Sequence, residues 1–172
     1  CYSQHVARRA SPAVDFLKND QSIWRYAVFT PPGTTKTMRQ NVGMFYDLQG
    51  VAGYDSLFSS QYRDYMALIE PQNETQYNLI AAFRDYSSLD SPLTDHLNVK
   101  YVITEAKIDS PKYEQAYQDE AVRIYENLGA MPRAFTLPTS ATIETHDFES
   151  TVQTRDPRHY VMLEDTNRDG YD

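Results

Sequence analysis

Cysteine is almost absent from this chain of 172 residues, and its single cysteine is the first residue. An internal disulfide is therefore impossible, and cysteine pairing gives no information on the redox compartment. No apolar run comes near the ~18 residues that a membrane-spanning helix needs. The sequence also lacks a Gly-x-Ser-x-Gly motif and a glycine-rich phosphate loop, which argues against the common serine hydrolases and phosphate-loop kinases.

Positive charge is also scarce, because 24 acidic residues outnumber 16 lysines and arginines and give a net charge of -8. The basic residues are scattered, whereas binding to a phosphate backbone needs a basic face, so we expect no nucleic-acid partner. The acidic surface also disfavours adhesion to anionic lipid. A hydrophobic content of 41% supports one folded domain, which we place at residues 12–164 between an N-terminal arm (1–11) and an acidic tail (165–172).

Helix starts and stops are the clearest local signals. Ser11-Pro12 and Ser91-Pro92 both place a capping serine before a proline at the first helical position. The first helix is expected to run through Leu17, and the second to end at Asn98, a residue type that tolerates the left-handed conformation. Short helices are also expected at 41–48 and 62–69, and the apolar stripe of the second predicts core positions, namely Tyr62, Tyr65, Met66 and Ile69.

Strand patterns alternate with these helices. The β-branched and aromatic residues at 23–30 and 99–104 predict strands, and 113–126 predicts a half-buried hairpin with Val122 and Ile124 on one face. Residues 71–88 are expected to form a loop with one helical turn at 79–83, and further short strands are expected at 133–137, 141–145 and 160–163. The predicted fold is α/β, with α+β as the alternative, in which short helices pack in two or three layers on a mixed sheet.

One turn outside the expected core carries polar groups suited to binding. Tyr54 and Asp55 lie in a turn bracketed by Gly50 and Gly53, where they could bind a ligand or serve as a packed tyrosine and a helix cap. The four histidines are isolated in sequence, and His96 between Leu93 and Leu97 is interpreted as a packed or capping residue in preference to a metal ligand.

The acidic tail resembles the first half of a calcium loop. Asp165, Asn167, Asp169 and the backbone of Tyr171 place oxygen ligands at alternate positions, and glycine stands at the sixth position. The sequence given ends at Asp172, before the bidentate acid of position twelve. Calcium is therefore a candidate ligand of this segment, and a polar tail without metal is the alternative.

Five short motifs together resemble a known family. Trp24-Arg25, Gly53 to Leu57 (Gly-Tyr-Asp-Ser-Leu), Asn98 to Ile103 (Asn-Val-Lys-Tyr-Val-Ile), Ile124 to Asn127 (Ile-Tyr-Glu-Asn) and Pro132 to Phe135 (Pro-Arg-Ala-Phe) occur in this order. Their order and spacing resemble the extracytoplasmic region of YfhO-like bacterial membrane proteins. Those proteins are similar to the multi-spanning glycosyltransferases of the GT-C type, which use polyprenyl-phosphate sugars.

The resemblance implies a domain on the extracytoplasmic face of the bacterial cell membrane, joined to a membrane-embedded remainder of the same protein. Sugar transfer would then depend on a catalytic acid outside this chain, and the domain would recognise an acceptor, a partner, a cell-surface glycan or a lipid-linked sugar. A purely structural or assembly module is the alternative. A free extracellular carbohydrate-active enzyme would be the third possibility, based only on the many carboxylates and tyrosines.

The resemblance also places three cations, Arg25, Lys100 and Arg133, within family motifs. Strand alternation predicts that Lys100 faces away from Val99 and Tyr101. A cation on a buried strand needs an acidic partner, and Asp95 or Glu126 is a candidate for a structural ion pair. The functional alternative is a pocket in which the cations bind a phosphate or a sugar.

Overall fold

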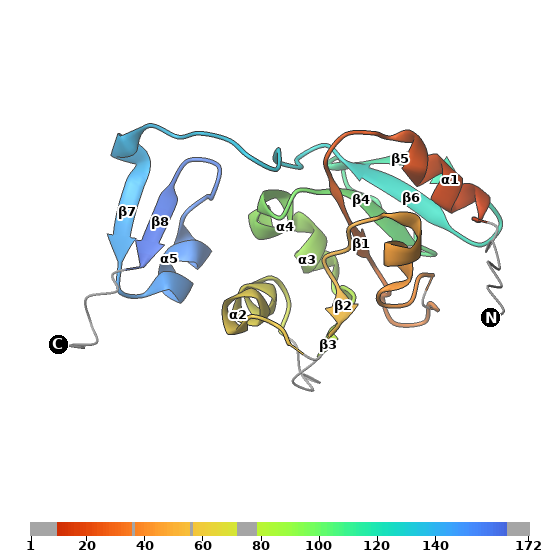
Figure 1. Ribbon diagram of the computed structural model, residues 1–172, viewed down its shortest axis with the longest axis horizontal. Coiled ribbons are helices and arrows are strands. Elements are labelled where there is room, and N and C mark those ends of the chain that lie inside the picture. Colours follow the sequence, from red (N-terminus) through yellow and green to blue (C-terminus); the bar gives the residue numbers. More distant parts are fainter. Residues whose placement is uncertain (1–9, 36, 56, 72–78, 165–172) are drawn as a thin grey trace, which may run out of the picture.

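A four-stranded mixed sheet forms the centre of the computed structural model, which describes residues 10–35, 37–55, 57–71 and 79–164 (Figure 1). The strand order is β1 (Arg25–Val28), β4 (Val99–Thr104), β6 (Arg123–Asn127) and β5 (Tyr113–Gln118). β1 pairs with β4 in parallel, and the other two pairings are antiparallel. The predicted α/β fold with a mixed sheet and a hairpin is therefore confirmed.

The two predicted capping serines lie at the starts of helices, as the sequence indicated. α1 (Pro12–Asn19) begins after Ser11, whose side chain accepts a hydrogen bond from the Val14 amide. α4 (Pro92–His96) begins after Ser91 in the same way. The chain then turns through Asn98, which has a φ of 61°. This left-handed residue redirects the backbone straight into β4.

Hydrophobic clusters cover both faces of the sheet. On one face, α1 packs with Trp24, Tyr101 and Ile124. On the other, residues of α2 (Ser60–Ile69), α3 (Tyr86–Asp90) and α4 pack against β1, β4 and β6. As predicted, Met66 and Ile69 of α2 are buried, and Tyr62 and Tyr65 pack against the same cluster.

The predicted hairpin is present, but only β5 is half-buried. In β6 the side chains of Ile124 and Tyr125 are both buried, on opposite faces. The sequence pattern indicated one buried face because it could not show that β6 would become an interior strand between β4 and β5.

A β-bulge overturns the predicted direction of Lys100. β1 pairs Arg25 with Val99 but Tyr26 with Tyr101, so Lys100 is an extra residue in β4. Lys100 and Tyr101 consequently reach the same acceptor, Asp20 Oδ2, at 2.6 and 2.9 Å. The simple alternation on which the prediction depended does not survive the extra residue.

Shorter elements close the outer edge of β1. The helix predicted at 41–48 is a 3-10 helix, η1 (Val42–Tyr46), and β2 (Gly53–Tyr54) pairs with β3 (Leu79–Ile80). The helical turn predicted at 79–83 is therefore wrong, since Leu79 and Ile80 pair with β2 and Phe83 bridges to Phe29. Gly50 lies against Tyr26, where a Cβ atom would be 2.9 Å from the ring.

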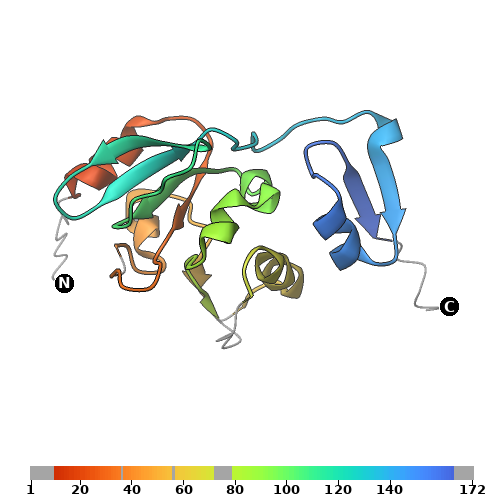
Figure 2. The same cartoon turned by 180° about the vertical axis from the view of Figure 1, so that it is seen from behind.

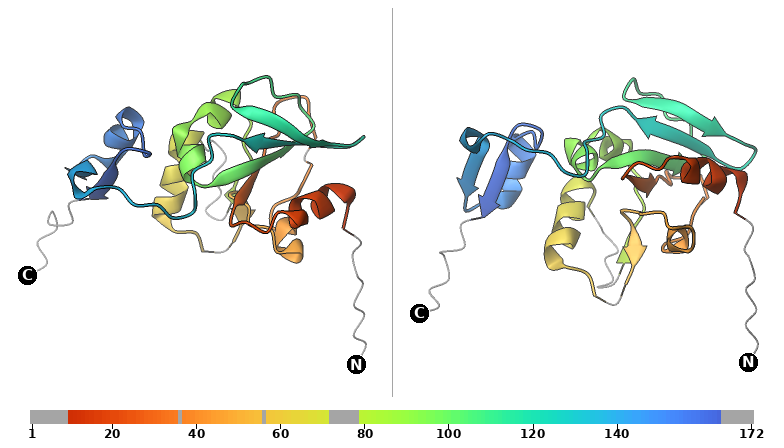
Figure 3. Two further views of the ribbon diagram at one scale, coloured as in Figure 1. Left: turned by 90° about the horizontal axis from the view of Figure 1, so that it is seen from above. Right: turned by 45° about the horizontal axis from the view of Figure 1, so that its top comes forward.

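A small β-α-β unit follows the main sheet (Figures 1 and 2). After η2 (Thr139–Ala141), β7 (Thr142–Thr145) and β8 (Val161–Glu164) pair in parallel, and α5 (Phe148–Thr154) connects them. Figure 3 shows this unit beyond α2 and α4, on the side away from α1. The strands predicted at 141–145 and 160–163 correspond to β7 and β8.

The strand predicted at 133–137 is absent from this part of the described chain, which instead connects the sheet to the β-α-β unit. A strand needs a neighbour to pair its backbone groups, and no described strand runs beside these residues. No helix among the described residues is both long and apolar enough to cross a membrane.

Candidate functional site

Arg25 and Arg133 form the centre of the candidate site and are called the arginine pair below. Arg25 is half-buried at the start of β1, where its Nη1 lies 3.4 Å from the Leu97 carbonyl oxygen. Burial lowers the pKa of Arg25, and the positive charge of Arg133 lowers it further. The two guanidinium groups are therefore close enough to repel each other.

Asn98 places the second arginine beside the first. Its side-chain amide donates a 2.8 Å hydrogen bond to the Met131 carbonyl, and the Met131 amide donates to the Asp95 carbonyl at 3.0 Å. These bonds fix the start of the connecting segment against the end of α4, and Arg133 follows two residues later. The residue that ends the helix thus also positions the distant arginine.

Tyr62 lies close to both members of the arginine pair. Burial raises the pKa of Tyr62, whereas the charges of Arg25 and Arg133 oppose that rise. The Tyr62 hydroxyl donates a 2.7 Å hydrogen bond to the Val51 carbonyl. This bond fixes the phenol at a position where the charges of both arginines act on its hydroxyl.

No described carboxylate lies within ion-pair distance of either guanidinium. Two neighbouring like charges, of which Arg25 is partly desolvated, are unfavourable together unless an anion compensates them. Arginine suits this role because its planar fork donates paired hydrogen bonds to phosphate or carboxylate oxygens. The arginine pair can therefore bind an anion, and Arg133 is exposed to solvent.

Tyr54 and Asp55 lie near this site through Tyr62. All three residues line one cavity of about 200 Å³, together with parts of η1 and β2. The Tyr54 amide donates a 3.0 Å hydrogen bond to Asn41 Oδ1, which fixes the loop, and the Tyr54 side chain is 54% exposed. The exposed ring can therefore contact a ligand in this cavity, whose described lining includes neither Arg25 nor Arg133.

Lys100 lies apart from these residues and already has acidic partners. Its ammonium group contacts Asp20 at 2.6 Å and Glu126 at 3.7 Å, so the predicted structural ion pair is present with Glu126 and, more closely, with Asp20. Asp95, the other candidate partner, instead pairs with Lys112 at 2.7 Å. Lys100 thus forms ion pairs that stabilise the sheet, and it does not contribute to an open anion pocket.

His96 is exposed at the end of α4, where it contacts two aromatic side chains. Its Nδ1 lies 2.9 Å from the Tyr65 hydroxyl, and its ring packs edge-on against Phe135. No group of three or more metal-binding side chains occurs among the described residues. The calcium loop predicted at Asp165, Asn167, Asp169 and Tyr171 lies outside them and stays a prediction.

Sequence reasoning identified Arg25, Arg133, Tyr54 and Asp55 but missed Tyr62, which connects them. Its helical spacing gave a signal for packing only, and nothing in that spacing indicated two nearby guanidinium groups. Comparisons with family models, curated proteins and solved structures gave no match to this chain.

Proposed function

We propose that this chain is a non-catalytic recognition domain that binds an anionic group between Arg25 and Arg133. The observation that carries the proposal is that Asn98 bonds both to the Arg25 amide and to the segment that leads to Arg133, while the described residues supply neither guanidinium with a carboxylate. A bound phosphate or carboxylate would remove the repulsion between them and accept their hydrogen bonds.

The sequence resemblance supports a specific setting for this binding. In that setting the chain is the extracytoplasmic domain of a multi-spanning, GT-C-like membrane protein in the bacterial cell envelope. Its ligand would be a phosphate-bearing cell-surface glycan or lipid-linked sugar, with Tyr54 and Tyr62 offering aromatic surface to the sugar. The catalytic acid of any sugar transfer would belong to the membrane-embedded remainder.

Titration with glycerol 3-phosphate, followed by backbone amide shifts, tests this proposal. Shifts should concentrate at Arg25, Asn98 and Arg133, and neutral glycerol should produce none. Arg133→Gln should weaken binding about tenfold, because an exposed arginine that donates to an anion contributes on the order of 1.5 kcal/mol.

Lys107→Gln is the matched control, because it removes the same charge beyond the opposite end of β4 from Arg25. It should leave the affinity within about twofold, as expected for a screened surface charge. Equal loss in both variants would indicate attraction by net charge alone and contradict the site. No shifts at millimolar ligand would instead favour the structural or assembly module.

A further inference from the structure

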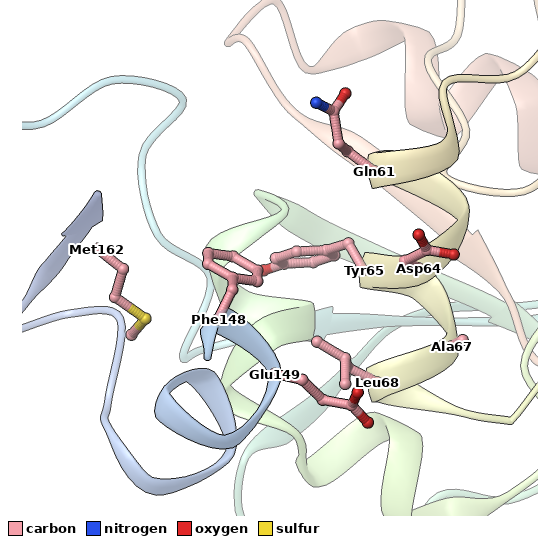
Figure 4. A pocket seen from close by; sticks show the side chains of 8 residues that line it. All are labelled: Gln61, Asp64, Tyr65, Ala67, Leu68, Phe148, Glu149 and Met162. Atoms are coloured by element: carbon pink, nitrogen blue, oxygen red, sulfur yellow. The ribbon is translucent and has the colours of Figure 1, made fainter. Parts of the chain in front are cut away.

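An apolar cleft lies between α2 and the β-α-β unit, away from the arginine pair. It consists of two cavities of about 630 and 450 Å³ that share Tyr65, Phe148 and Met162 as walls. Figure 4 shows Phe148 and Met162 of the β-α-β unit facing α2, with Tyr65 directed toward Phe148. The shared walls make the two cavities one elongated cleft.

The smaller cavity forms the apolar end of the cleft. Its described lining contains no aspartate, glutamate, lysine or arginine, and includes Leu93, Phe135, Val152 and Tyr160. Such a surface favours hydrocarbon over charged groups, since a charge placed there would lose its hydration.

His96 is the one histidine among the described residues that line this end, and it contacts Tyr65. The Tyr65 hydroxyl donates a 3.1 Å hydrogen bond to the Leu93 carbonyl and lies 2.9 Å from His96 Nδ1. Partial burial lowers the pKa of His96. This shift favours the neutral imidazole, and the described lining of the apolar end contains no lysine, arginine or carboxylate, although Arg155 lies 5.3 Å from the centre of the Tyr160 ring.

The larger cavity gives the opposite end of the cleft a negative charge. Asp64 and Glu149 line it, and its described lining includes no lysine or arginine. Arg63 pairs with Asp64 at 2.9 Å, but both side chains are largely exposed and the pair is screened by water. Glu149 forms no ion pair with any described residue, which leaves net negative charge at this end.

We infer that this cleft binds an amphiphile with a hydrocarbon chain and a cationic amine head. The chain would lie among Phe135, Val152 and Tyr160, and the amine would lie between Asp64 and Glu149. The polarity of the two ends decides both the ligand class and its direction of binding. This inference does not depend on the proposed anion site.

Three ligands with the same chain and different heads test the inference: octylamine, 1-octanol and octanoate, each below its micellar concentration. Amide shifts should map to α2, α5 and the segment at 133–137 for octylamine. Its affinity should exceed that of octanoate at least about fivefold, the ratio expected for a partly exposed charge pair. Octylamine should also bind about tenfold more tightly than hexylamine, because two further methylene groups are buried.

Glu149→Gln should reduce the preference for octylamine over octanoate to about twofold, and should leave 1-octanol binding unchanged. Glu114→Gln, a matched change on β5, should keep the preference. Phe148→Ala should weaken all three ligands, whereas Phe45→Ala, which removes a phenyl that is 71% exposed on η1, should weaken none.

Three binding results would each overturn the inference. They are octanoate binding as tightly as octylamine, a head preference unaffected by Glu149→Gln, and absence of binding by all three ligands. Shifts that map to the arginine pair instead of the cleft would overturn it as well, and would leave the proposed anion site unaffected.

Discussion

Asp20 joins two separate parts of the chain through one carboxylate. Its oxygens accept hydrogen bonds from Ser22, Lys100 and Tyr101, which connects the end of α1 to β4. Burial alone would raise the pKa of Asp20, but the hydrogen bonds from Lys100, Ser22 and Tyr101 outweigh it and hold the pKa well below 3.8. Burial, followed by the hydrogen bond to Asp20, raises the pKa of Tyr101 to about 12, while the charge of Lys100 opposes that rise.

Asp20→Asn should therefore destabilise the fold by about 2 kcal/mol at pH 7, the cost of losing hydrogen bonds to a charged group. Because folding lowers the pKa of Asp20, its contribution is fully present above the ordinary value of 3.8 and is lost as the pH falls below it. Urea unfolding of the parent and the variant should thus differ at pH 7 and converge toward pH 2.

Asp109→Asn is the control for this substitution, because Asp109 is exposed between β4 and β5. It should change stability by less than about 0.5 kcal/mol at either pH. A difference for Asp20→Asn that persists unchanged into acid would show that the carboxylate charge is not what stabilises this contact.

Residues also show where sequence reasoning reaches its limit. Ser11, Ser91 and Asn98 were predictable because each acts on backbone groups within a few positions of itself. The closer partner of Lys100, Asp20, was not predictable, because it lies eighty positions away in the chain and the contact depends on a bulge. The proximity of Arg25 to Arg133 depends in the same way on a distant bond, from Asn98 to Met131.

At the scale of elements, β4 has the most strongly determined environment. It lies between β1 and β6, and the side chain of Val102 is 0% exposed in the cluster with Val99 and Tyr125. Val102→Asp should destabilise the fold by about 3 kcal/mol or more, because it buries an unpaired carboxylate. Chemical denaturation at pH 7 measures this loss.

Leu128→Asp provides the comparison, since Leu128 directly follows β6 and is 61% exposed. The same introduced group should there cost less than about 0.5 kcal/mol. Equal stability of the two variants would mean that β4 is not an interior strand.

Elements were predictable where local pattern and tertiary environment agree. The run at 99–104 is apolar enough to form a buried strand, and β4 occupies all of it. The run at 133–137 has comparable local character but no neighbouring strand, so it remains a connection. Residues 79 and 80 became a strand for the opposite reason, because β2 offers them a pairing edge.

At the scale of the whole molecule, the β-α-β unit contacts the main sheet domain through few buried side chains. Val152 of α5 joins the main cluster, and Met162 packs against it from β8. A chain that ends at residue 137 should therefore keep its cooperative thermal unfolding and lose about 1–3 kcal/mol of stability, the value of burying one or two apolar side chains. It should also lose octylamine binding, because one wall of the cleft is removed.

A chain that ends at residue 164 is the control, since it keeps the whole β-α-β unit and the cleft. Its melting temperature and octylamine affinity should match those of the parent. Broad, non-cooperative melting of the shorter chain would show that the β-α-β unit is required for the main domain to fold.

The parallel pairing of β1 with β4 also determines the order in which the sheet can assemble. β4, β6 and β5 lie close together in sequence. Arg25 and Val99, which pair at the start of β1 and β4, are instead separated by most of the first hundred residues. Closing so long a loop costs entropy before any strand contact compensates it. We therefore expect the three antiparallel strands to form the folding nucleus and β1 to dock late, so that the arginine pair comes together only in the final steps of folding.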